Sequence, residues 1–222
     1  AYRDLGVRAF SLDSEDELNK IVEETAGANG RARDLKLYVR IAVPAKNSRI
    51  PLERKFGIAG PKAARLLVKT RQVAAELGVT FHVGSQTTTP DAYGTAFGEV
   101  GKLIARAGVV VDAIDCGGGF PSRYGDSVPA PLSSYIEVIK AGMGRLPVGD
   151  GCRLICEPGR ALVAEAESLI VRVDARKGSD LHVNDGSYGA LFDAAHLGFV
   201  FPVRLIATGG APGGDLVAFG MW

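Results

Sequence analysis

FHVGSQTTTPDAYG, residues 81–94, begins as an apolar β-strand and then changes abruptly into small and polar residues. Such an ending suits a strand whose carboxyl end is approached closely by something polar. Other short runs, apolar and rich in β-branched residues, recur roughly 30 to 45 residues apart, which is the spacing of βαβ units. These runs are RAFSLDS (8–14), LKLYVRIAV (35–43), VVVDAIDC (109–116) and RLICEP (153–158).

Amphipathic helices are predicted between these strands. Ser14 and Glu17 form a capping box ahead of an apolar helical face. A second helix is predicted to open at Pro61 and to end at Gly78. A third is predicted to open at residues 89–91, with the inward positions Tyr93, Phe97, Val100 and Ile104. The alternation predicts a parallel sheet with helices outside it.

Chemically distinctive residues stand at the carboxyl ends of several different predicted strands. They are Arg40, His82 with Ser85, Gly117 to Gly119, and Glu157 with Arg160. An open doubly wound sheet also fits the alternation, but no GxGxxG fingerprint follows the first strand. Sites assembled from several strand ends are typical of barrels. We therefore predict an α/β fold in which residues 1–160 form about five strands of a TIM-like (β/α)8 barrel.

The pattern changes after Arg160. The runs 161–176, 180–189 and 201–207 alternate in hydrophobicity, and no predicted helix separates them. This pattern is typical of antiparallel strands with one solvated face. Residues 161–222 are therefore predicted to form a separate, mostly antiparallel β-domain.

Composition narrows the class of partner. The 222 residues carry a formal net charge of +1, so there is no electrostatic reason to expect nucleic acid or an acidic membrane surface. No apolar run approaches the ~20 residues of a membrane span, and residues 1–10 lack the pattern of a signal peptide. We expect a cytoplasmic protein that acts on a small molecule.

The three cysteines argue against a disulfide framework, because their number is odd and Cys116 and Cys156 lie in strand-like runs. Cys152 and Cys156 make a C-x3-C pair. No second pair of cysteines or histidines completes a metal site, so we expect no bound metal.

Each strand-end group also has a purely structural interpretation. The three glycines could form a flexible turn, His82 could be a core histidine, and Glu157 could pair with Arg160 at the surface. However, glycines after a buried strand let N–H groups close on an anion. Glu157 follows an apolar strand, where burial of its carboxylate would require a partner. Together the groups suit a flat ring with a phosphate and a basic nitrogen, as in pyridoxal phosphate.

FHVGS, DCGGGFP and CEPGR, in this order and spacing, resemble the ornithine/diaminopimelate/arginine decarboxylase family, the pyridoxal-phosphate barrels of the alanine racemase fold type. The resemblance includes LDSEDEL, LYVRIA and KFG and covers nearly the whole chain. GGGFP and VNDGSYG resemble the ornithine decarboxylase branch. This implies decarboxylation of ornithine, possibly lysine, to a diamine for polyamine biosynthesis, by a homodimer with active sites at its interface.

The resemblance also implies roles for the strand-end residues. His82 stacks on the cofactor ring, and Glu157 pairs with the protonated ring nitrogen. Ser85, Gly117, Gly118, Gly119 and Arg160 hold the phosphate. Arg40 points into the barrel near the site, because it is offset by one residue from the outward-facing apolar positions of its strand.

Parts of the family pattern have no match in this sequence. The resemblance places the cofactor-bound lysine on an earlier barrel strand and a Cys-Asp motif after a glycine, and neither is present here. Lys36 and Lys102 lie at the edges of elements, and Lys55 resembles an interface residue. Asp193 is offset from the family's substrate-binding aspartate. We expect an incomplete barrel followed by an incomplete β-domain.

Three alternatives remain at this stage. One is diaminopimelate decarboxylase. A second is a non-catalytic homologue that keeps the fold as a binding or regulatory module, which loss of the pyridoxal contacts would indicate. The third is a metal-dependent barrel hydrolase, but His82, His182 and His196 do not cluster in the sequence.

Overall fold

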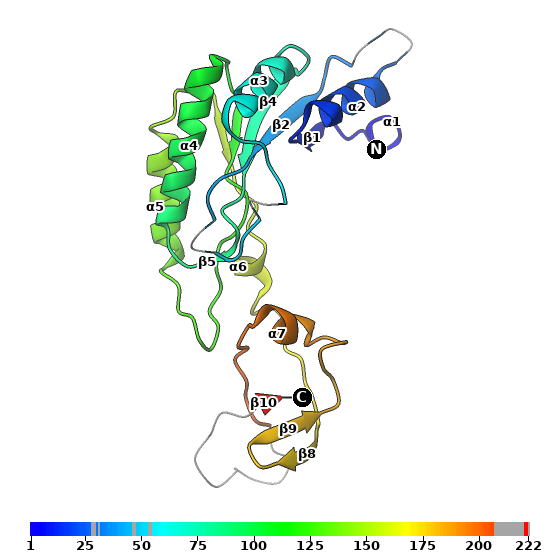
Figure 1. Cartoon of the computed structure of the whole chain (residues 1–222), viewed down its shortest axis with the longest axis vertical. Helices are drawn as coiled ribbons and strands as arrows, with labels where there is room; N and C mark the ends of the chain where they lie inside the picture. The colour runs from blue at the N-terminus through cyan, green and yellow to red at the C-terminus, as the bar shows by residue number, and fades with distance from the viewer. Residues whose placement is uncertain (28–29, 31, 46–47, 53–54, 207–219, 222) are drawn as a thin grey trace. The chain divides into compact units, whose positions relative to one another are not determined.

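The computed structural model describes residues 1–27, 30, 32–45, 48–52, 55–206 and 220–221. It divides into two compact units (Figure 1). Unit 1 comprises residues 1–121 and 129–162, and unit 2 comprises residues 122–128 and 163–222.

Unit 1 is built on a five-stranded sheet in the order β1-β2-β4-β6-β7, and every adjacent pair is parallel. The strands are β1 (Ala9–Leu12), β2 (Lys36–Ile41), β4 (Glu76–Phe81), β6 (Ala113–Asp115) and β7 (Arg153–Ile155). Their spatial order follows the chain without reversal. A doubly wound sheet reverses its strand order at a switch point, whereas a barrel does not. The arrangement is therefore part of a barrel wall.

Four helices connect the strands of unit 1: α2 (Glu15–Thr25), α3 (Gly60–Arg71), α4 (Asp91–Ala107) and α5 (Leu132–Met143). Helix α1 (Tyr2–Leu5) precedes β1, and α6 (Arg160–Val163) follows β7. Figure 1 shows α4 and α5 side by side along the strands. On β2, burial alternates: Leu37, Val39 and Ile41 are buried, while Arg40 lies on the other face and is half-buried. Arg40 therefore lies on the face opposite to these apolar residues.

Two of the predicted helices have the expected features. The Ser14 hydroxyl accepts a hydrogen bond from the Glu17 N–H at 3.1 Å, as a capping box requires. In α4 the predicted inward positions are all buried: Tyr93, Phe97, Val100 and Ile104.

The prediction that a helix ends at Gly78 is wrong. Helix α3 ends at Arg71, and β4 already begins at Glu76. Gly78 pairs with Tyr38 of β2, and a Cβ on Gly78 would lie 2.2 Å from Tyr38 Cδ1. The glycine therefore admits the tyrosine ring against the strand and does not terminate a helix.

A two-stranded antiparallel ladder follows the end of β4. It joins β3 (Ser48–Ile50) to β5 (Ser85–Thr87). The chain thus turns out of the barrel wall immediately after His82 and pairs elsewhere. Gln86, at the centre of β5, is fully buried and has a positive φ of 55°.

Unit 2 contains a small sheet in the order β10-β9-β8 and the helix α7 (Phe192–Leu197). Strands β8 (Val173–Lys177) and β9 (Asp180–Val183) are antiparallel, and β10 (Gly220–Met221) is parallel to β9. Two expectations for this region are wrong. Residues 161–163 are helical, and residues 201–206 form no strand. Phe201 of the latter segment contacts the Tyr124 ring.

None of the helices in the described part of the chain is both long and apolar enough to cross a membrane.

Candidate functional site

The carboxyl ends of β4, β6 and β7 bring three of the predicted groups together. The Glu157 N–H donates a hydrogen bond of 2.8 Å to the Gly117 carbonyl. A Cβ on Gly118 would lie 2.6 Å from the Glu157 carbonyl oxygen and 3.2 Å from His82 Nε2. Gly118 therefore sits between the imidazole and the backbone of Glu157, with room for no side chain.

The carbonyls of this glycine turn, residues 117–119, all accept hydrogen bonds. Gly118 accepts from the Tyr93 hydroxyl at 2.9 Å, and Gly119 accepts from the Thr87 N–H at 2.9 Å. By contrast, the N–H groups of Gly118 and Gly119 have no acceptor among the residues that the structure describes. Gly118 is buried, and buried N–H groups rarely stay unpaired. Two adjacent donors of this kind suit an anion.

Ser85 and Arg160 lie next to this turn. Arg160 Nη2 donates to Ser85 Oγ at 3.3 Å, although the two residues are 75 positions apart. A Cβ on Gly119 would lie 2.3 Å from the Gly84 carbonyl oxygen, so the backbone before Ser85 packs directly on the glycine turn. A guanidinium, a hydroxyl and two N–H groups thus gather in one place, and all of them suit a phosphate.

The His82 ring is held by its own backbone. Its Nδ1 accepts a hydrogen bond from the Gly84 N–H at 3.0 Å. Burial lowers the pKa of His82, and the nearby Arg40 guanidinium lowers it further. Since Nδ1 is the acceptor, the neutral ring carries its proton on Nε2. The result is a flat, neutral imidazole with a fixed orientation.

Glu157 differs from the expectation in one respect. Its side chain is exposed rather than buried, because it follows β7, the edge strand of the described sheet. Even so, partial desolvation raises the pKa of Glu157, and the Asp115 carboxylate raises it further. Arg40 opposes both effects.

Arg40 supplies positive charge to the site. Its guanidinium lies 4.5 Å from the centre of the Phe56 ring and lines a narrow crevice together with Phe56 and His82. A cation stacked on an aromatic face is attracted by the ring quadrupole. The contact therefore keeps Arg40 beside His82 and the two carboxylates.

The sequence reasoning missed Asp115 and Tyr93 as parts of this site. Asp115 bonds to the glycine turn through its side chain, and Tyr93 does so from α4. An aspartate inside the apolar strand immediately before CGGG was a usable signal. No sequence signal indicated the role of Tyr93, because its position in the helix matches that of an ordinary core residue.

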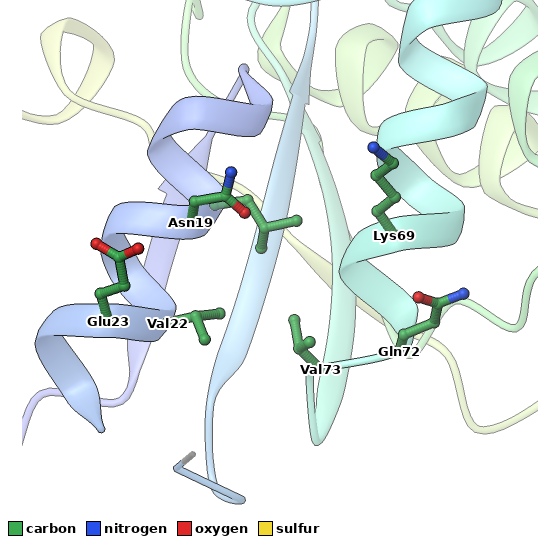
Figure 2. A pocket seen from close by; sticks show the side chains of 7 residues that line it. Asn19, Val22, Glu23, Lys69, Gln72 and Val73 are labelled. Carbon is green, nitrogen blue, oxygen red and sulfur yellow. The ribbon is translucent and has the colours of Figure 1, made fainter. Parts of the chain in front are cut away.

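The pocket in Figure 2 lies elsewhere in unit 1. It has a volume of about 290 Å³ and lies between α2 and α3. Val22 and Val73 point toward one another across it, with Asn19, Glu23, Lys69 and Gln72 around them. This groove in the helix layer brings together no groups that suit the expected cofactor.

Residues 1–164 match the family model described as pyridoxal-dependent decarboxylase, pyridoxal binding domain. The chain belongs to this decarboxylase family. The ornithine decarboxylase of Cricetulus griseus is 31% identical over 223 residues, covering 90% of this chain and 47% of that protein. The diaminopimelate decarboxylase of Pseudomonas fluorescens is 32% identical over 183 residues, covering 78% and 43%.

Among solved structures, the lysine/ornithine decarboxylase of Vibrio vulnificus, complexed with cadaverine, aligns with a TM-score of 0.74 and 25% identity. The alignment covers 92% of this decarboxylase-family chain and 54% of the other. The predicted (β/α) barrel is thereby confirmed. This chain spans about half the length of the curated relatives that it matches.

The residues present fit the family's pyridoxal phosphate. The N–H groups of Gly118 and Gly119 and the Ser85–Arg160 pair are complementary to its phosphate. Gly118, which has no side chain, lies against the edge of the His82 ring. The described residues contain no group of three or more histidine, cysteine or acidic side chains able to hold a metal.

Proposed function

We propose that this protein decarboxylates a basic amino acid with pyridoxal phosphate, and that ornithine is the preferred substrate and lysine the second. The observation that supports the proposal is the glycine turn beside His82 and Glu157, whose carbonyls accept hydrogen bonds while the Gly118 and Gly119 N–H groups have no acceptor among the described residues. When bound, pyridoxal phosphate supplies an electron sink for the electron pair that loss of CO2 leaves behind.

The phosphate is held by the N–H groups of Gly118 and Gly119, the Ser85 hydroxyl and the Arg160 guanidinium. Three of these donors lose little conformational freedom on binding, because two belong to the backbone and one to a short serine side chain. Arg160 adds a charge-assisted hydrogen bond, which is roughly twice as strong as a neutral one. The anchor therefore fixes where the ring lies.

His82 and Glu157 act on the ring. The neutral imidazole, oriented by the Gly84 N–H, provides an aromatic face for stacking without adding a second cation. The Glu157 carboxylate accepts a hydrogen bond from the protonated ring nitrogen. The negative charge of this carboxylate favours the protonated form of the ring nitrogen through a charge-assisted bond.

Diaminopimelate is the alternative substrate, since a diaminopimelate decarboxylase is 32% identical over 78% of this chain, against 31% over 90% for an ornithine decarboxylase. We further propose that the protein is cytoplasmic, forms a homodimer with active sites at the interface, and supplies a diamine for polyamine formation. Three free cysteines, Cys116, Cys152 and Cys156, support a reducing compartment.

The test uses the protein as its genome encodes it, loaded with pyridoxal phosphate. We expect CO2 release from ornithine to be faster than from lysine, arginine or diaminopimelate. Arg160→Ala should raise the dissociation constant of the cofactor about 10-fold or more, from the loss of a charge-assisted bond. Arg106→Ala, which removes an exposed arginine from α4, is the matched control. Equal cofactor affinity in all three proteins would place the phosphate elsewhere.

A further inference from the structure

Asp115 is a buried carboxylate at the end of β6 to which the proposed chemistry assigns no task. It is 9% exposed. In the sheet register Arg40 pairs with Thr80, and Thr80 pairs with Asp115, so the three form one polar row across β2, β4 and β6. A carboxylate this deeply buried needs partners, or its desolvation destabilises the fold.

Within the described part of the chain, Asp115 has three favourable contacts. Asp115 Oδ1 accepts a hydrogen bond of 2.9 Å from the Gly117 N–H. The Thr80 hydroxyl donates to the same carboxylate, and Arg40 contributes a favourable charge. Burial raises the pKa of Asp115, and these three contacts oppose that rise. The carboxylate is thus fixed from two sides, with Gly117 as its contact in the glycine turn.

Gly117 links this carboxylate to Glu157. Its N–H points to Asp115, while its carbonyl accepts the Glu157 N–H at 2.8 Å. Its φ is +65°, and a Cβ would lie 2.2 Å from the Phe81 carbonyl oxygen, so the residue occupies a conformation and a space that suit glycine alone. The orientation of Gly117 therefore determines both the turn that follows and the backbone of Glu157.

The Asp115–Gly117 bond also distinguishes the first N–H group of the turn from the next two. The Gly117 N–H is directed into the barrel wall by Asp115, whereas the next two N–H groups have no acceptor among the described residues. A hydrogen bond from Oδ1 to the N–H two residues on is a common local turn in aspartates. Here the bond lies between Arg40, which supplies the positive charge, and the Gly118 and Gly119 N–H groups. An ordinary surface turn has no such neighbours.

We propose that Asp115 is a positioning residue, which sets the glycine turn through the Gly117 N–H and so aims the Gly118 and Gly119 N–H groups at the cofactor phosphate. The proposal rests on the proposed function for the identity of the phosphate. The part that concerns the Asp115–Gly117 hydrogen bond and the turn rests on this chain's own residues and does not depend on the cofactor. The carboxylate acts as a hydrogen-bond acceptor at a defined place, so the position of the oxygen matters more than the charge.

Three substitutions separate position from charge. Asp115→Asn keeps an oxygen at the same place and removes the charge. Asp115→Glu keeps the charge and moves the oxygen by one methylene. Asp115→Ala removes both. Asp112→Ala is the matched control, because Asp112 lies just before the start of the same strand, accepts the Leu77 N–H at 2.8 Å and pairs with Arg71, away from the glycine turn.

Two measurements decide the proposal: hydrogen exchange of the Gly117 amide followed by NMR, and the dissociation constant of pyridoxal 5'-phosphate followed by equilibrium dialysis. For Asp115→Ala we expect exchange and the dissociation constant to rise about 10-fold or more, as for loss of a bond to a charged acceptor. Asp115→Glu should raise both values as Asp115→Ala does. Asp115→Asn should stay within about 3-fold of wild type, because an amide oxygen still accepts the bond. Asp112→Ala should leave both values unchanged.

If Asp115→Ala shows the wild-type exchange rate at Gly117 and the wild-type dissociation constant, the proposal is overturned. Equal weakening in the Asn and Ala variants would also overturn it, because charge would then be the active property. If Asp115→Ala does not fold, the contrast between Asn and Glu still decides. If wild type binds no pyridoxal phosphate, the proposed function fails, while exchange of the Gly117 amide still shows whether Asp115 holds the turn.

Discussion

The Glu157 N–H donates to the Gly117 carbonyl at 2.8 Å, and this bond joins the end of β7 to the glycine turn after β6. Two motifs that lie about 40 residues apart in sequence thus become one backbone unit, as expected where parallel strands of a barrel end side by side. Gly118 then packs between Glu157 and His82. Substitutions at these positions should affect the cofactor more than the fold.

Gly118→Val should weaken cofactor binding strongly. A Cβ at this position meets the Glu157 carbonyl oxygen at 2.6 Å, so the turn must shift and its N–H groups lose their aim. We expect the dissociation constant of pyridoxal phosphate to rise about 10-fold or more, from the loss of a hydrogen bond to a charged group. The control is Gly98→Ala in α4, where a Cβ meets nothing within 4 Å. Unchanged affinity in Gly118→Val would contradict the placement of the phosphate.

Glu157→Gln should reduce turnover far more than stability. An amide cannot carry the negative charge that keeps the ring nitrogen protonated, so the electron sink weakens. A loss of several kcal/mol corresponds to a fall in kcat on the order of 10² or more. Urea unfolding should change little, because the side chain is exposed. Glu137→Gln, at an exposed position in α5, is the control. Wild-type turnover in Glu157→Gln would refute the assignment.

The lowered pKa of His82 predicts a pH dependence of stability. The folded protein favours the neutral ring, so this contribution is fully present above the unfolded pKa of about 6.5 and is lost as the pH falls toward the lower folded value. The raised pKa values of Asp115 and Glu157 act in the opposite direction at lower pH. The comparison of wild type with His82→Gln, by urea unfolding at pH 7.5 and 5.5, isolates His82. Wild type should lose more stability between these two pH values than the variant does.

Cys156 should be alkylated before Cys116. Cys116 is fully buried, and burial raises the pKa of its thiol to about 12, so it is almost entirely protonated at neutral pH. Cys156 is exposed. Iodoacetamide at pH 8 followed by peptide mass spectrometry should find label at Cys156 and reach Cys116 only after unfolding. Early labelling of Cys116 would show that β6 opens readily.

Residues 1–222 expressed alone should bind pyridoxal phosphate weakly but release no CO2 from ornithine. Reaction requires a lysine close to the ring, and several lysines are held in ion pairs with other partners: Lys36 with Glu76, Lys69 with Glu15 and Lys102 with Glu99. Borohydride reduction followed by peptide mapping locates any lysine attached to the cofactor. A labelled lysine within these residues, together with CO2 release, would show that the chain is catalytically sufficient.

Local chemistry explains why much of this architecture could be predicted. The alternation of strands and helices follows from hydrophobic periods of 2 and 3.6 residues, which each segment carries by itself. The capping box at Ser14 and the inward face of α4 were correct for the same reason. His82, the glycine turn and Glu157 could be selected because polar and flexible residues directly after apolar strands are locally conspicuous.

Long-range contacts decided the rest. Gly78 matches a helix end in sequence, but the Tyr38 ring 40 residues earlier makes it a strand residue. The exposure of Glu157 depends on the place of β7 at the edge of the described sheet, which no local pattern encodes. Likewise, the bond between Arg160 and Ser85 and the polar row of Asp115 exist only once separate strands are in register. Sequence thus determined which residues could serve a cofactor, and tertiary structure decided which of them meet, because hydrogen bonds act only over contact distances.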